Sequence, residues 1–191
     1  MLYIKELWKL ELKILFDKII NQMLEEEVND EWGKGIYSRY RKDLEIDKRG
    51  SFGERFFMKI FANSKYCSRI EYNDGDQGVW DLKINRIRLE IKTSSLTINK
   101  KNKNFAKNKF QNEGIREEKG SYEGVLFLGI APNDLYIKMV KYEDIPFCDL
   151  HSREKAKTGV GYKWDIKLED MLEVINEDDI ISEFEKVFIK K

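Results

Sequence analysis

One stretch of the chain alternates apolar and polar side chains so regularly that few folds can accommodate it. Residues 78–95 read GVWDLKINRIRLEIKTSS, and the apolar positions on the two sides of Asn85-Arg86 are Trp80, Leu82, Ile84, Ile87, Leu89 and Ile91. A period of two is typical of a strand with one buried face, and a short break that contains Asn is typical of a tight turn. We therefore predict a β-hairpin with Asn85-Arg86 as its turn, and a register that pairs Ile84 with Ile87 and Leu82 with Leu89.

The polar face of this hairpin brings charged side chains together. The same register places Asp81 opposite Glu90, with Lys92 two residues further along that face. Two carboxylates whose Cβ atoms lie about 5 Å apart repel each other unless a cation lies between them. A divalent metal ion meets that need, and so does an arginine from a neighbouring strand. The hairpin alone leaves both solutions open.

The order Asp81, eight intervening residues, then Glu90-Ile91-Lys92 resembles the motif of the PD-(D/E)xK nuclease superfamily, to which many type II restriction endonucleases belong. Trp80 stands where the name of the motif has proline. The resemblance implies that Asp81 and Glu90 bind a metal together with the Ile91 carbonyl, and that Lys92 positions or activates the attacking water. It also implies a Mg²⁺ cofactor, which Mn²⁺ can replace, and an α/β fold (α+β, mixed sheet) with helices flanking a central mixed sheet.

The residue types and motifs that the sequence lacks exclude several other kinds of site. The chain has one histidine, His151, and two isolated cysteines, Cys67 and Cys148. These residues cannot form a four-ligand structural zinc site, and a Ser/His/Asp triad is poorly supported. There is no GxxxxGK[ST] phosphate loop and no GxGxxG dinucleotide motif. The cysteines indicate reduced thiols in a cytoplasmic protein, with a disulfide between them as the alternative.

The segments before the hairpin predict two helices in a single domain of residues 1–191. Apolar residues at spacings of three and four predict a long helix over residues 2–28, followed by a loop with one short irregular element to residue 49. A second helix is expected over residues 51–62, with Ser51 as N-cap and Glu54 closing a capping box. By resemblance to the nuclease family, Glu54 instead completes the metal shell. A short strand over residues 67–73 follows.

The segment after the hairpin is basic and rich in asparagine. Residues 97–120 carry seven basic and three acidic side chains, although the whole chain has no net charge. Lysine and asparagine mixtures contact phosphates well and read little sequence. We expect a basic loop that leads into a helix over about residues 105–116, and a solvated helix face is the alternative. The candidate DNA contacts are Lys100, Lys101, Lys103, Lys107, Lys109, Gln111 and Arg116.

The remaining chain predicts the rest of the sheet. Residues 122–131 are almost continuously apolar, which is typical of a central strand buried on both faces, and residues 135–142 predict its antiparallel neighbour. The expected order over residues 51–142 is therefore the α-β-β-β-α-β core of the nuclease fold. A strand from residue 162 and one or two short helices over residues 168–188 would form a C-terminal extension, residues 162–188. No apolar run approaches the roughly 20 residues that cross a membrane.

The resemblance implies a Mg²⁺-dependent endonuclease that hydrolyses double-stranded DNA. One such site cuts one strand, so a duplex break needs a second site. The small size of the chain and the lack of a zinc finger or helix-turn-helix favour the catalytic small subunit of a heterodimeric type IIS restriction endonuclease, whose larger subunit recognises the DNA. The alternatives are a self-sufficient homodimeric type II restriction endonuclease and a non-catalytic DNA-binding or assembly protein on the same scaffold.

Overall fold

The computed structural model describes residues 2–25, 44, 46–73, 80–97, 109–131, 134–155 and 160–189. Its helices are α1 (Leu2–Glu25), α3 (Ile46–Ala62) and α4 (Glu177–Phe184), the last continuing into a π-helical turn over Glu185–Ile189. Its strands are β1 (Ile70–Tyr72), β2 (Leu82–Ile84), β3 (Ile87–Thr97), β4 (Lys109–Ile115), β5 (Gly124–Ile130), β6 (Leu135–Lys141), β7 (His151–Ser152), β8 (Tyr162–Lys167) and β9 (Leu172–Val174).

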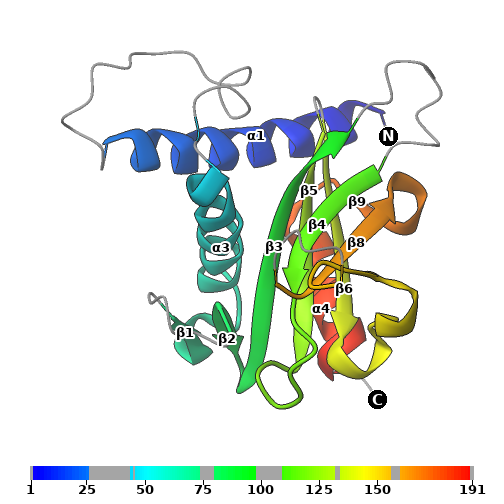
Figure 1. The fold of residues 1–191 in the computed structure, drawn as a ribbon. Coiled ribbons are helices and arrows are strands. Elements are labelled where there is room, and N and C mark those ends of the chain that lie inside the picture. The colour runs from blue at the N-terminus through cyan, green and yellow to red at the C-terminus, as the bar shows by residue number, and fades with distance from the viewer. Residues whose placement is uncertain are drawn as a thin grey trace.

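The strands form one mixed sheet with helices around it (Figure 1). Its main path runs β7-β8-β4-β3-β5-β6-β9, and β1 and β2 extend from β3. β3 and β5 are parallel, and the other strand pairs of this sheet are antiparallel. The expected mixed α/β sheet flanked by helices is therefore confirmed at this coarse level.

The hairpin has the predicted register. Ile84 pairs with Ile87, and Leu82 pairs with Leu89. The two turn residues, Asn85 and Arg86, have positive φ angles of 49° and 75°, which is the backbone of a type I′ turn. This turn suits the right-handed twist of the two strands that it joins.

β3 is the longest strand and β5 is the most buried one. Every residue of β5 is buried, as expected for a central strand. It pairs with β3 from Leu89 to Ser95, and with β6 along its whole length on the other side. The predictions of a buried strand over residues 122–131 and an antiparallel neighbour over residues 135–142 are both confirmed. β3 is consequently held in place over the segment that contains Glu90 and Lys92.

The helix expected over residues 105–116 is wrong in its described part. Residues 109–115 form β4, which pairs with β8 through contacts such as Phe110 with Ile166. Phe110 and Asn112 are buried while Gln111 between them is exposed, and this alternation suits a strand. The sequence interpretation matched Phe110 to a helical spacing because the partner strand lies far away in the chain. The predicted α-β-β-β-α-β order is therefore not observed here.

The predicted N-terminus of the second helix is also wrong. α3 begins at Ile46, so Ser51 lies inside the helix and Glu54 closes no capping box. The first turn makes a local contact that the capping pattern did not anticipate, a 2.9 Å hydrogen bond from Arg49 Nε to the Leu44 carbonyl just before the helix. α1 agrees with the predicted helix through residue 25, and residues 26–28 lie outside the described residues.

The helices bury aromatic side chains against the sheet. In Figure 1, α3 runs alongside β3, and α1 crosses the end of α3 at the top of the view. The rings of Phe16 in α1 and Phe52 in α3 lie 4.8 Å apart, and those of Phe61 in α3 and Phe184 in α4 lie 4.9 Å apart. Aromatic pairs at such distances contribute beyond the area that they bury. They fix α3 against its neighbours.

The C-terminal extension is part strand and part helix. β8 confirms the strand expected from residue 162. Residues 172–174, assigned to a helix from the sequence, form β9 because the edge of β6 is available for pairing. α4 is a short helix, as predicted, and begins with a capping box between Asn176 and Asp179. Cys67 and Cys148 are both exposed free thiols. Within the described ranges, no helix is long and apolar enough to cross a bilayer.

α3 packs tightly on β3 at Gly53. A Cβ atom added there would lie 1.9 Å from Thr93 Oγ1 and 3.3 Å from Ile91 Cγ2, both on β3. The absence of a side chain at Gly53 therefore sets the distance between the helix and the strand. Gly50, one turn earlier in α3, has no atom within 4 Å of an added Cβ.

We predict opposite effects for alanine at these two glycines. Gly53→Ala should lower the free energy of unfolding by about 2 kcal/mol, because the methyl group overpacks the contact with Thr93. Gly50→Ala should leave it unchanged or raise it by up to about 1 kcal/mol, because alanine favours a helix and nothing obstructs it. Urea denaturation followed by circular dichroism measures both. Wild-type stability of Gly53→Ala would contradict the close packing.

Candidate active site

A cleft of about 500 Å³ opens between α3, β3 and β4. In the described residues β4 pairs with β8 from Lys109 to Ile115, but with β3 only through Leu96 with Phe110 and Thr97 with Lys109. The separation of these two strands leaves room for the cleft. The residues that line it are Arg49, Gly50, Glu54, Asp81, Glu90, Ile91, Lys92, Thr93, Ser94, Ser95, Gln111, Asn112 and Glu113.

Asp81 is attached to β3 on both sides of Glu90. Its backbone amide donates to the Leu89 carbonyl at 2.9 Å, and its Oδ2 accepts a 2.6 Å hydrogen bond from the Ile91 amide. Asp81 lies just before the first paired residue of β2, Leu82. The structure thus brings Asp81 next to Glu90, as the hairpin register predicts, but a side-chain hydrogen bond replaces the regular ladder at this point.

Glu90 and Lys92 are neighbours on one face of β3. Lys92 Nζ lies 2.5 Å from Glu90 Oε1, and Glu90 is only 8% exposed. Residues two apart in a strand project to the same side, so their sequence spacing explains this contact. The lysine provides a positive charge in a group of residues that otherwise carries negative charge.

Glu54 joins this group from α3. Its Oε2 accepts a 2.8 Å hydrogen bond from the Tyr72 hydroxyl, and it lines the same cleft as Asp81. Glu54 follows Gly53, a residue at which α3 packs tightly on β3. Glu54 therefore lies at the cleft, and its predicted role in a capping box does not apply.

The electrostatics of the cleft oppose ionisation of Asp81. Burial, followed by the negative charge of Glu90, raises the pKa of Asp81 from 3.8 to about 7. The charge of Glu54 also raises this pKa, whereas the Ile91 amide and Lys92 lower it. Ionised Asp81 would therefore lie unfavourably close to the negative charges of Glu90 and Glu54. A bound cation would relieve this repulsion.

The oxygen donors of the cleft suit a hard divalent cation. No three His, Cys, Asp or Glu side chains converge to hold a metal in the ranges that the structure describes. Mg²⁺, however, commonly keeps several waters and binds through one or two carboxylates together with a phosphate of its substrate. Asp81 and Glu90 can supply those carboxylates. The residues present fit Mg²⁺ or Mn²⁺ in that partly hydrated form.

The expected DNA contacts are only partly located. Lys100, Lys101, Lys103 and Lys107 lie outside the described residues. Gln111 is exposed and lines the cleft, whereas Arg116 lies beyond the end of β4 and does not line it. Lys109 lies 2.5 Å from Asp165, so its ammonium group is engaged in an ion pair. Among the described residues of this set, Gln111 is thus the one that lines the cleft.

The sequence interpretation missed Ser94 and Asn112. Ser94 Oγ donates to Asn112 Oδ1 at 3.0 Å, and Asn112 Nδ2 donates to the Phe110 carbonyl at 3.3 Å. The hydrogen bond between Ser94 and Asn112 connects β3 and β4 where the two strands separate. Asn112 is only 2% exposed, and a polar residue at a buried position in an alternating strand is the signal that could have identified it.

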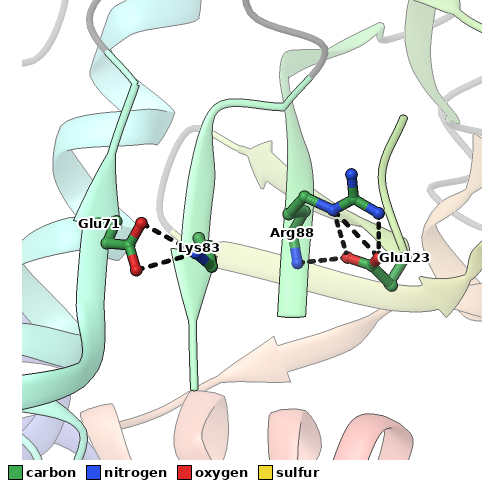
Figure 2. Close-up of polar contacts among 4 residues, drawn as sticks. All are labelled: Glu71, Lys83, Arg88 and Glu123. Carbon is green, nitrogen blue, oxygen red and sulfur yellow. Dashed lines mark hydrogen bonds and ion pairs between the residues drawn. The ribbon is translucent and has the colours of Figure 1, made fainter. Parts of the chain in front are cut away.

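Other charges of the hairpin are paired outside the cleft. Lys83 Nζ lies 2.9 Å from Glu71, and Arg88 contacts Glu123, as Figure 2 shows. None of these four residues lines the cleft. Their exposure makes each pair weak as a source of stability. Lys83 and Arg88 lie on the hairpin, and these two pairs provide controls of matched chemistry outside the cleft.

Replacing Asp81 should stabilise the metal-free protein at alkaline pH. Because its folded-state pKa is raised, the folded protein holds this proton more tightly, and stability falls as pH rises from about 4 to about 7. Asp81→Asn avoids this loss and keeps an oxygen for the Ile91 amide. We expect a free energy of unfolding about 2 kcal/mol above wild type at pH 8 in EDTA, and little difference at pH 4.

Thermal and urea unfolding at the two pH values measure this difference. Glu71→Gln is the control, since Glu71 is exposed outside the cleft and should show no such gain at pH 8. An Asp81→Asn variant that is no more stable than wild type at pH 8 would contradict the crowding of carboxylates.

Comparison with known proteins assigns no family. No protein-family model matches the chain, and no curated protein matches it either. The site therefore has to be interpreted from the chemistry and geometry of its own residues.

Proposed function

We propose that the chain is a divalent-metal-dependent DNA endonuclease of the PD-(D/E)xK type. The observation that carries this proposal is the presence of Asp81, Glu90 and Lys92 in one cleft, on the hairpin where that motif requires them. The mixed sheet supports it, because its longest strand carries both Glu90 and Lys92.

Asp81 and Glu90, with the Ile91 carbonyl, are the residues proposed to hold Mg²⁺ or Mn²⁺. Glu54 does not converge with these two carboxylates in the described residues, so it is proposed to complete the metal shell through a water that the ion keeps. When bound, the ion would lower the pKa of a water molecule and neutralise negative charge on the phosphate. Asp81 would orient the bound ion, because hydrogen bonds to Leu89 and Ile91 attach this residue to the β3 backbone.

Lys92 is proposed to orient the attacking water and to stabilise negative charge that develops on the phosphate. Its ammonium group donates to Glu90, so it is held at the cleft beside the carboxylates. In the reaction, the water oxygen bonds to phosphorus and the bond from phosphorus to the 3′-oxygen breaks. The products are a 5′-phosphate and a 3′-hydroxyl, and the leaving oxygen gains a proton. Charge stabilisation of this kind typically contributes about 100-fold or more to the rate.

A second site is needed to break both strands of a duplex. We propose that this chain is the strand-cleaving small subunit of a heterodimeric type IIS restriction endonuclease, in which a larger subunit recognises the DNA. A homodimer is the alternative arrangement. Sedimentation of the purified chain separates the two, because a self-sufficient enzyme of this kind would be a dimer.

Cleavage of supercoiled plasmid with Mg²⁺ tests the function. We expect nicking that EDTA abolishes, and a loss of about 100-fold or more in Lys92→Met. Lys83→Met is the matched control, because it removes a lysine that is also paired with a glutamate on this hairpin but lies outside the cleft. It should retain wild-type activity.

A wild-type chain that does not cut alone should cut once its larger subunit is added, with the same dependence on Lys92. Equal activity of Lys92→Met and wild type, in either setting, would refute the assignment of the site. Failure of the chain to cut in both settings would refute the function.

A further inference from the structure

We propose that Tyr72 is a positioning residue for the metal site, and that it acts by holding the Glu54 carboxylate toward the cleft. This inference rests on the proposed metal-dependent function and adds a residue that the Asp, Glu and Lys motif does not contain. Tyr72 belongs to β1, which precedes the hairpin and does not line the cleft. Its hydroxyl group would therefore influence the site through Glu54.

The contact between Tyr72 and Glu54 joins two elements that are separate in the chain. The Tyr72 hydroxyl donates a 2.8 Å hydrogen bond to Glu54 Oε2 in a partly buried setting. The tyrosine ring packs against the main hydrophobic core. With its ring held by packing, the hydroxyl has a defined position. A hydrogen bond to a charged group in such a setting is stronger than an average one.

The end of β1 also fixes Asp81. Tyr72 pairs with Leu82, the residue after Asp81, and the Asn73 amide donates to the Asp81 carbonyl at 3.1 Å. Asn73 Nδ2 donates to the Trp80 carbonyl at 3.0 Å. One short segment, Tyr72 and Asn73, thus contacts both the backbone of Asp81 and the side chain of Glu54. It can set the distance between the two carboxylates.

Glu54 needs such support because its side chain has three rotatable bonds. The carboxylate also lies near Asp81, whose charge would push it away. The hydrogen bond from Tyr72 engages Oε2 and leaves Oε1, for which the described part of the chain offers no hydrogen-bond partner. Partners that orient a metal ligand commonly change metal affinity by about 10-fold or more when they are removed.

Titration with Mn²⁺ alone, followed by the electron paramagnetic resonance of the free ion, tests this role without DNA or turnover. We expect Tyr72→Phe to weaken Mn²⁺ binding about 10-fold, because the ring stays in the core and only the hydroxyl is lost. Tyr66→Phe is the matched control. The Tyr66 hydroxyl donates to Glu185 at 3.2 Å, and neither residue lines the cleft, so this variant should bind Mn²⁺ as wild type does.

A double variant separates positioning from a general structural effect. If Tyr72 acts through Glu54, Tyr72→Phe should add no further loss in the Glu54→Gln background. Wild-type Mn²⁺ affinity of Tyr72→Phe would overturn the inference, and so would an equal loss in both backgrounds. Unchanged melting temperatures of the variants would confirm that folding is intact.

The outcomes also distinguish this inference from the proposed function. A wild-type chain that binds Mn²⁺ and cuts DNA, with no effect of Tyr72→Phe on binding, would refute the positioning role alone. Mn²⁺ binding that depends on Tyr72, without DNA cleavage in any setting, would support the positioning role and refute the nuclease. A wild-type chain that binds no Mn²⁺ without DNA would refute the positioning role, whereas the plasmid cleavage assay decides the nuclease function separately.

Discussion

The candidate site depends on backbone hydrogen bonds that force two carboxylates together. The amide of Asp81 and its carboxylate bind Leu89 and Ile91, the residues on either side of Glu90, so Asp81 cannot move away from Glu90 without breaking these two hydrogen bonds. Repulsion between the carboxylates and their burial oppose this arrangement, as the raised pKa of Asp81 records. The packed hairpin and the pairing of β3 with β5 offset that penalty. Sites that store such unfavourable charge are frequently functional.

The third carboxylate comes from a helix, and small features of packing bring it there. Gly53 allows α3 to contact β3 at Thr93, and Glu54 is the next residue of that helix. Tyr72 then binds Glu54 from β1. Three segments of the chain therefore meet at the cleft, and the absence of a side chain at Gly53 is as important as the chemical groups around it. A rigid scaffold around a group of charges is what binding and catalysis generally need.

The sequence interpretation succeeded where structure depends on near neighbours. The hairpin register follows from alternating residues and a turn of two residues, and both depend on short-range geometry. The proximity of Asp81, Glu90 and Lys92 follows from that register. The interpretation failed at Phe110, where one apolar residue fits a helical and a strand pattern equally well. It failed at Ser51 as well, because a residue type that caps helices well can also lie inside one, as Ser51 does in a helix that begins at Ile46.

By itself, the sequence determined the hairpin and its turn, the buried central strand and the long N-terminal helix, and it brought Asp81, Glu90 and Lys92 onto one face. Only the tertiary structure decided that residues 109–115 pair with β8, that α3 begins at Ile46, and that Glu54 meets Tyr72 at the cleft. The physical reason is the distance along the chain over which each interaction acts. Turn chemistry and alternation act over a few residues, whereas strand pairing and side-chain contacts between distant segments depend on partners that the local sequence does not specify.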